Sequence, residues 1–200
     1  LAYEGVALVL PNLAHEDYEK SYLLFISSMY KHKNVKRLID AFSILIKKYG
    51  YIGNLILVGK KDYFSSEIEE YVSKLQLNER VFLPGQKAYV SDEDTSRLRK
   101  NAQLFVFPSL KEGFSLTPLE AMASGLCCVI SDIACHREVF GDSVFYFNPL
   151  LSEEIAKSID TVLKNPQLKE ELIKKGYECV KKYNWSKTAL ITLDVFKQVL

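Results

Sequence analysis

Two glutamates in the stretch Pro108–Gly125 stand where side chains could contact a small ligand. Glu112 lies in a predicted loop behind the apolar run Leu104–Phe107. Glu120 follows after seven intervening residues, in the first turn of the next predicted helix. In an open α/β sheet, small molecules bind beyond the carboxyl ends of the strands, where helix N-termini present N–H groups to anions. Because a carboxylate repels phosphate but binds hydroxyls, the pair indicates a ligand that carries both groups, as a nucleotide sugar does.

Both glutamates also have purely structural interpretations. Thr117 at the N-cap, Pro118 at the first helical position and Glu120 at the third would form a capping box. Glu112, which stands between a lysine and a glycine, could be an ordinary solvated loop residue. Since one carboxylate offers several acceptor sites, a cap and a ligand contact are compatible for Glu120, and both interpretations stay open.

A basic cluster at the start of the first predicted helix comprises Lys31, Lys33, Lys36 and Arg37. Basic side chains are poorly placed at a helix N-terminus unless an anion offsets the helix dipole. Lys33 immediately precedes Asn34, the candidate N-cap, and is the candidate cation for a phosphate group. For the rest of the cluster, a solvated helix start is the alternative interpretation.

The spacing of the histidines and cysteines does not indicate a metal site. His32 and His136 have no Cys, Asp or His partner at ligand spacing, so we predict no metal and no other cofactor. The four cysteines form no C-x-x-C pair and are interpreted as small buried hydrophobes in a reducing compartment; they are Cys127, Cys128, Cys135 and Cys179.

Charge and hydropathy exclude several classes of function. The 26 basic and 25 acidic side chains leave a formal charge of +1, which argues against a nucleic-acid-binding surface. No apolar run approaches the roughly 20 residues that span a bilayer, and no signal segment opens the chain. We therefore expect a soluble, cytoplasmic protein. Its 200 residues, 48% of them hydrophobic, fit one domain with a single core.

Apolar runs of strand length alternate with helical patterns, which predicts an α/β fold with a Rossmann-like, doubly wound parallel sheet. The predicted strands are 22–26, 55–58, 81–83, 104–107, 127–130 and 144–147. Helical spacing predicts helices over 35–49 and around 68–75, and a further helix with Ser91 as its N-cap. The remaining pattern predicts C-terminal helices near 152–164, 167–182 and 186–199.

Several segments, in order along the chain, resemble the retaining GT-B glycosyltransferases of family 4. Residues 112–125 resemble that family's segment with two glutamates seven residues apart, and Lys31–Phe42 resembles its lysine loop and following helix. Further similar segments are Asn54–Gly59, Val81–Gly85, Ser131–Glu138 and Tyr183–Trp185, so the resemblance covers roughly residues 20 to 200.

GT-B enzymes of this family have two Rossmann-like halves. The resemblance implies that residues 1–200 form the carboxyl-terminal half, which binds the nucleotide-sugar donor. Within it, residues 183–200 are expected to form a terminal helix that packs toward the missing N-terminal half.

The resemblance also implies a role for each candidate site residue. Glu112 contacts the donor sugar near the reacting carbon, Glu120 binds the ribose hydroxyls, and Lys33 neutralises the leaving diphosphate without a metal. Gly113 lets the backbone approach the ligand, and Val90 lies near the base. The amides expected to face the distal phosphate are those of Phe114, Ser115 and Leu116.

Two positions depart from the family's pattern. Ser28 stands where relatives commonly carry an arginine, which leaves the diphosphate with one fewer cation. Ser115 stands where many relatives have glycine, which argues against a left-handed backbone at that position.

The function implied is that of a hexosyltransferase, which moves a sugar from a nucleoside-diphosphate sugar to an acceptor hydroxyl with retention of configuration. Its biological setting would be polysaccharide or glycoconjugate biosynthesis. The expected partners are the donor and a glycan or lipid-linked acceptor, with no nucleic acid and with any peripheral membrane contact made by the missing half. A GT-B-like epimerase or phosphorylase is one alternative. A catalytically silent subunit that binds nucleotide or protein is another, and Ser28 keeps it open.

Overall fold

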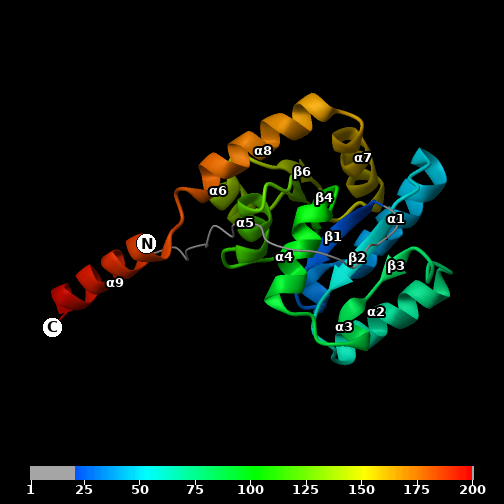
Figure 1. Ribbon diagram of the computed structural model, residues 1–200, viewed down its shortest axis with the longest axis horizontal. Coiled ribbons are helices and arrows are strands. Elements are labelled where there is room, and N and C mark those ends of the chain that lie inside the picture. Colours follow the sequence, from blue (N-terminus) through cyan, green and yellow to red (C-terminus); the bar gives the residue numbers. More distant parts are fainter. Residues whose placement is uncertain (1–20, 200) are drawn as a thin grey trace.

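The computed structural model describes residues 21–199, which form a six-stranded parallel sheet in the order β3-β2-β1-β4-β5-β6 (Figure 1). The strands are β1 (Tyr22–Ile26), β2 (Asn54–Val58), β3 (Val81–Phe82), β4 (Leu104–Phe107), β5 (Cys128–Ser131) and β6 (Phe145–Phe147). This topology confirms the predicted Rossmann-like, doubly wound α/β sheet. Residues 1–20, which the single-domain prediction includes, lie outside the described residues.

Helices connect the strands and continue beyond the last one. They are η1 (Lys31–Lys33), α1 (Val35–Tyr49), α2 (Tyr63–Lys74), α3 (Pro84–Lys87), α4 (Asp92–Asn101), α5 (Leu116–Ala123), α6 (Ala134–Phe140), α7 (Ser152–Leu163), α8 (Pro166–Val180) and α9 (Trp185–Val199). The strand order reverses between β1 and β4, so right-handed crossovers put α1 and α2 on one face and α5 and α6 on the other. The C-terminal helices lie where the sequence predicts them, whereas α3 and α6 were not predicted.

The core of the molecule lies at the centre of the sheet. Every residue of β1, β2 and β4 is buried, as continuous apolar strands covered on both faces should be. Leu23 and Leu24 of β1 pair with β2 on one side and with Leu104 and Phe105 of β4 on the other. This pairing sets the carboxyl ends of β1 and β4 side by side, so the segments that leave these two strands must meet.

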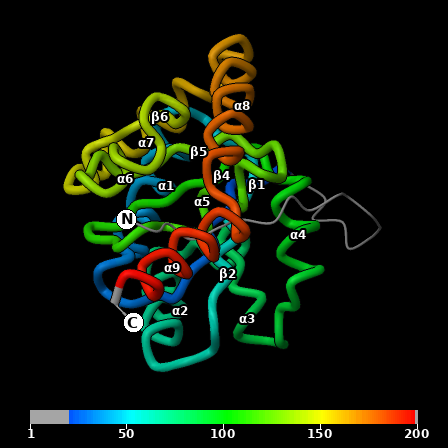
Figure 2. Tube along the Cα trace, turned by 90° about the vertical axis from the view of Figure 1, so that its left-hand side faces the viewer, coloured from blue at the N-terminus to red at the C-terminus, as the bar shows by residue number. Residues whose placement is uncertain are grey.

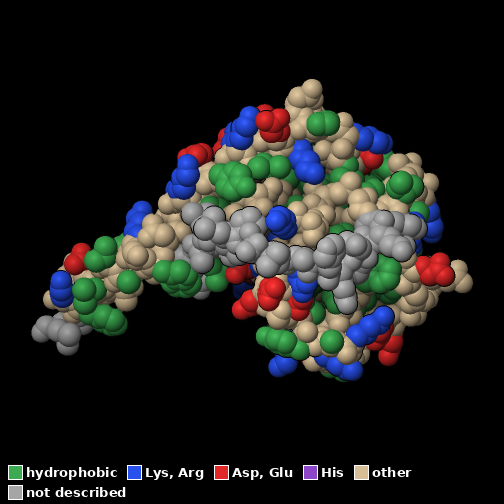
Figure 3. Space-filling model, viewed as in Figure 1, with side chains coloured by type: hydrophobic (Ala, Val, Ile, Leu, Met, Phe, Trp, Pro, Cys, Tyr) green, Lys and Arg blue, Asp and Glu red, His purple; other side chains and the backbone are tan. Residues whose placement is uncertain are grey.

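Helix α9 projects away from the rest of the molecule (Figure 1). The chain passes into it from α8, as the tube in Figure 2 shows. Its exposed large apolar side chains are Trp185, Leu190, Leu193, Val195 and Phe196, and they form much of the hydrophobic surface at this end of the molecule (Figure 3). Within residues 21–199, neither α9 nor any other helix is long and apolar enough to cross a membrane.

Candidate functional site

Lys33 and Glu112 lie 79 positions apart in the sequence and meet beyond the carboxyl ends of the central strands. Lys33 follows β1, and Glu112 lies in the loop that follows β4. Lys33 Nζ donates to Glu112 Oε1 at 2.6 Å, and the two side chains are only 13% and 10% exposed. Since β1 and β4 are the neighbours at which the strand order reverses, this pair occupies the point where doubly wound sheets bind their ligands.

Backbone and side-chain contacts tie the lysine segment to the glutamate loop. The amide of Leu110 donates to the carbonyl of His32 at 2.7 Å. Asn34 Nδ2 donates to the carbonyls of Pro108 at 3.1 Å and Pro149 at 2.8 Å. Asn34 is the N-cap of α1, as predicted, but it has a left-handed backbone and its side chain makes no capping bond. Its side chain instead joins three segments around Lys33.

Ser115 corrects one sequence-based expectation, because its backbone is left-handed, with φ 86° and ψ 70°. His136 Nδ1 lies 2.8 Å from the carbonyl of Ser131, which can only accept, so Nδ1 carries the proton and Nε2 accepts. Ser115 Oγ therefore donates to His136 Nε2, at 3.1 Å. His136 is fully buried, and this burial lowers its pKa below the ordinary value of 6.5. The bond to a neutral, fixed imidazole accounts for a conformation that serine adopts at a cost.

The predicted capping box at Thr117 is wrong. Helix α5 begins at Leu116, so Thr117 is its second residue and Glu120 lies beyond the first turn. The carboxylate of Glu120 accepts instead from Arg99 Nη2 of helix α4. Sequence reasoning missed Arg99, because an arginine beside Leu98 on a charged helix gives no signal of burial.

The N-terminus of α5 has features that anion-binding helix N-termini share. Ser115 provides no side-chain cap, and the first turn contains no acidic residue. A Cβ built on Gly113 would meet no atom within 4 Å, so the backbone there is open to approach. The amides of Phe114, Ser115 and Leu116, which the resemblance assigns to the distal phosphate, belong to this segment.

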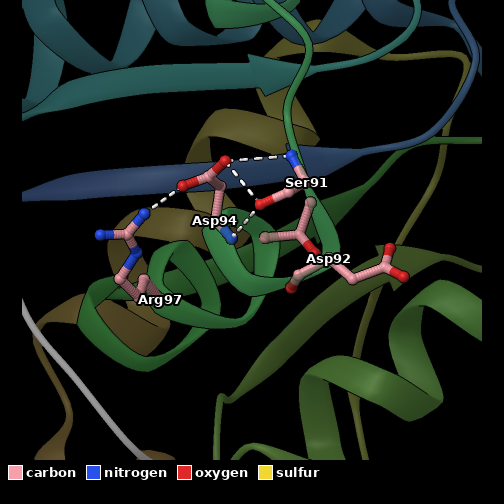
Figure 4. Close-up of polar contacts among 5 residues, drawn as sticks. Ser91, Asp92, Asp94 and Arg97 are labelled. Carbon is pink, nitrogen blue, oxygen red and sulfur yellow. Dashed lines mark hydrogen bonds and ion pairs between the residues drawn. The ribbon is translucent and has the colours of Figure 1, made fainter.

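Val90 is half-buried and directly precedes Ser91, the N-cap of α4. The amide of Asp94 donates to Ser91 Oγ at 3.1 Å, and the amide of Ser91 donates to Asp94 Oδ2 at 3.0 Å. This capping box, with Arg97 reaching the same aspartate, is drawn in Figure 4 and confirms the predicted N-cap. Helix α4 thus carries Val90 before its first turn and Arg99 in its last.

The remaining candidates are less closely tied to this centre. Ser28 is half-buried in the segment between β1 and η1. Burial raises the pKa of the Cys127 thiol to about 12 and raises that of Cys128, as for the small buried hydrophobes predicted, whereas Cys135 is only half-buried. In the described part of the chain, no three His, Cys, Asp or Glu residues are grouped as metal ligands.

A separate groove of about 570 Å³ lies along β6 and α7. Its lining includes Asp132, Arg137, Tyr146 and Lys157, and none of the predicted site residues. Arg137 Nε donates to Asp132 Oδ1 at 2.6 Å, and Arg137 Nη2 donates to Asp132 Oδ2 at 2.7 Å. The guanidinium lies 3.8 Å from the Tyr146 ring centroid. Arg137 and Asp132 thus satisfy each other at the edge of this groove.

Comparisons with known proteins agree on one family. Residues 14–179 match the model of the family described as glycosyl transferases group 1. The chain is 29% identical over 178 residues to O-antigen chain mannosyltransferase B of Escherichia coli, covering 89% of this chain and 46% of that protein. It is 30% identical over 168 residues to O-antigen chain mannosyltransferase RfbU of Salmonella typhimurium, covering 84% and 44%.

Among solved structures, the chain is similar to sucrose-phosphate synthase from Thermosynechococcus elongatus, with a TM-score of 0.77 and 25% identity. That similarity covers 90% of this chain and 46% of the other. The chain therefore spans about half the length of these relatives.

Proposed function

This chain belongs to the group 1 glycosyl transferases, and from that premise we propose that it is the donor-binding half of a retaining GT-B hexosyltransferase. The whole enzyme moves a sugar from a nucleoside-diphosphate sugar to an acceptor hydroxyl. The N-terminal half, outside this chain, supplies the acceptor side. The observation that carries the proposal is the contact between Lys33 and Glu112 at the reversal point of the sheet.

The two members of this pair suit the two sides of the bond that breaks. Glu112 offers acceptor sites for sugar hydroxyls, and its negative charge favours the oxocarbenium character that develops at the reacting carbon. Lys33 offers three donors and a positive charge for the departing diphosphate. Their separation of 2.6 Å sets both groups around one small region, which is what a sugar joined to a diphosphate requires.

The surrounding segments complete the donor site. The amides of Phe114, Ser115 and Leu116 and the start of α5 bind the distal phosphate, and Gly113 leaves room for it. Glu120 binds the ribose hydroxyls and Val90 contacts the base. Lysine and helix N-terminus together supply the positive charge, so the reaction needs no metal and no cofactor.

The names of the relatives guide the choice of substrate. Two of them are O-antigen chain mannosyltransferases, so mannose is the first sugar to test and a glycan or lipid-linked chain is the first acceptor. Helix α9 packs against the N-terminal half, which would cover its exposed apolar side chains.

Two measurements on the full-length protein test the proposal. Release of nucleoside diphosphate from GDP-, UDP- and ADP-sugars, with magnesium or with EDTA, identifies the donor and should proceed in both. NMR of the anomeric proton in the product then shows retention or inversion. Inversion, or activity that disappears in EDTA and returns with magnesium, would contradict the mechanism.

A catalytically silent nucleotide-binding subunit is the second candidate, because by resemblance Ser28 stands where relatives commonly carry an arginine. It predicts binding of the diphosphate without release from any sugar nucleotide. An epimerase or phosphorylase would instead convert the donor without transfer, or require phosphate as acceptor.

A further inference from the structure

Arg99 is a buried cation with incomplete hydrogen bonding. The residue is 8% exposed, and its Nη2 donates to Glu120 Oε2. Its Nη1 lies 3.5 Å from Thr95 Oγ1, and its buried Nε–H has no partner within the described residues. Desolvation of a guanidinium is costly unless a carboxylate compensates it, so the contact with Glu120 is what makes this position of Arg99 tolerable.

Glu120 differs from Arg99 in its access to solvent. Its side chain is 38% exposed, whereas that of Arg99 is 10% exposed. Arg99 bonds to Oε2, and a carboxylate has about four acceptor sites, so Glu120 keeps acceptor capacity for a second partner. Bound in this way, the carboxylate loses rotamer freedom before a ligand arrives.

We propose that Arg99 is a positioning residue, which holds the Glu120 carboxylate for the ribose hydroxyls of the donor and so makes the site selective for ribonucleotides. This inference rests on the ribose-binding role of Glu120 in the proposed function. Arg99 touches no substrate in this scheme, because it acts through Glu120.

The position of α4 supports this role. The capping box of Ser91 and Asp94 fixes the start of the helix, next to Val90 at the proposed base site. Arg99 lies in the last turn of the same helix and reaches across to Glu120 on α5. Helix α4 thereby connects the proposed base contact at its start to the proposed ribose contact at its end.

The test compares ribonucleotides with analogues that lack the ribose hydroxyls. Calorimetric dissociation constants are measured with the full-length protein for GDP, UDP and ADP and for their 2′,3′-dideoxy counterparts. In the parent, removal of the hydroxyls should weaken binding about tenfold or more, as loss of hydrogen bonds to a charged group does. In Arg99→Leu the ribonucleotide should bind more weakly while the dideoxynucleotide is unaffected, so the ratio approaches one.

Two further variants keep the test independent of folding. Arg99→Lys retains the charge without the guanidinium fork and should give an intermediate ratio. Lys100→Leu removes an exposed cation of the same helix and should keep the parent ratio. Urea unfolding of each variant verifies the fold, and if Arg99→Leu does not fold, the Arg99→Lys ratio decides.

The outcomes separate this inference from the function beneath it. A parent that binds no nucleoside diphosphate, or binds ribo and dideoxy forms equally, would overturn the donor-site assignment itself. A large parent ratio that Arg99→Leu and Arg99→Lys both retain would overturn only the role of Arg99. Equal weakening of both ligand classes in Arg99→Leu would also overturn it, since that result indicates a structural role.

Discussion

At the scale of single residues, the opposite charges of Lys33 and Glu112 are each largely withdrawn from water. A nearly buried pair of this kind depends on both partners, because the removal of one leaves the other uncompensated, at a cost of about 3–5 kcal/mol. A substitution that removes one charge can therefore impair binding through stability as well as through a lost contact. Experiments at this pair must separate the two effects.

We predict that Lys33→Ala weakens nucleoside-diphosphate binding by about 10- to 150-fold, which corresponds to a charge-assisted contact of about 1.5–3 kcal/mol. Nucleoside binding should change little, because a nucleoside has no phosphate for Lys33 to contact. Calorimetric titration with nucleoside, monophosphate and diphosphate measures the effect, and Lys31→Ala, at an exposed lysine, is the control.

The double variant Lys33→Met with Glu112→Gln removes both charges and should recover stability in urea without recovering diphosphate affinity. Glu112→Gln alone should spare the free diphosphate and weaken the sugar donor. If Lys33→Ala binds diphosphate as well as the parent, the basic cluster is only a solvated helix start and the phosphate site lies elsewhere.

The buried His136 leads us to predict that the stability of the protein depends on pH. Because burial lowers the pKa of His136 in the folded protein, the unfolded chain binds more protons than the folded protein once the pH falls below about 6.5. The free energy of unfolding should therefore be fully maintained above pH 6.5 and decline below it, by at most about 1.4 kcal/mol per pH unit for one proton. Urea unfolding at pH 7.5 and 5.5 measures this slope.

His136→Gln should remove that contribution to the slope, while His32→Gln, at an exposed histidine, serves as the matched control. An unchanged slope in His136→Gln would show that the imidazole does not titrate with folding. It would also remove the reason for treating it as the fixed, neutral acceptor of the Ser115 hydroxyl.

At the scale of elements, α4 and α5 differ in how their N-termini are capped. Helix α5 has no side-chain cap at Ser115 and starts beside the open backbone at Gly113, which is why we propose its N-terminus as the anion site. Helix α4 satisfies its own N-terminus through Ser91 and Asp94, and this capping box supports the start of the helix. Hydrogen bonds to Ser91, the largest cause, and to Arg97 lower the pKa of Asp94, so this support weakens in acid.

We predict that Ser91→Ala lowers the free energy of unfolding by about 0.5–2 kcal/mol, the usual cost of a lost N-cap. Denaturant unfolding near neutral pH measures this change. Ser96→Ala, in the middle of the same helix, is the control and should be neutral or slightly stabilising, because alanine is the better helix former. A Ser91→Ala variant as stable as the parent would mean that the box of Figure 4 contributes nothing to the fold.

At the scale of the whole molecule, α9 stands out because it exposes several large apolar side chains. Its Trp185, Leu193 and Phe196 are each about half exposed or more, at 55%, 48% and 59%. The chain spans about half of its relatives' length, and the proposed occupant of this surface is the N-terminal half of the enzyme.

We predict that Phe196→Glu combined with Leu193→Glu lowers sugar transfer by the full-length enzyme and leaves nucleotide affinity nearly unchanged. Burial of each large apolar side chain contributes about 1.5–3 kcal/mol, so the loss should weaken the contact between the halves. Transfer rate and nucleotide dissociation constant are measured together. Lys187→Gln, a polar exposed change on the same helix, should preserve both, and unimpaired transfer in the double variant would exclude α9 from the interface.

The sequence alone determined the fold class, the strand positions and the assignment of Glu112 to a loop and Glu120 to a helix. These features depend on the periodicity of apolar residues and on local turn and cap signals, which a linear chain displays directly. The N-cap at Ser91 was predictable for the same reason. The start of α5 was not, because its Thr-Pro-x-Glu pattern satisfied a local capping rule that tertiary contacts override.

Only the tertiary structure decided which side chains meet. The contact of Lys33 with Glu112 requires β1 and β4 to be neighbours, and that pairing arises from the sheet order. The left-handed Ser115 depends on a buried histidine 21 positions away, and the partner of Glu120 comes from another helix. The sequence around one residue of such a contact does not indicate its partner, because the free energy that holds the two together comes from packing of the whole core.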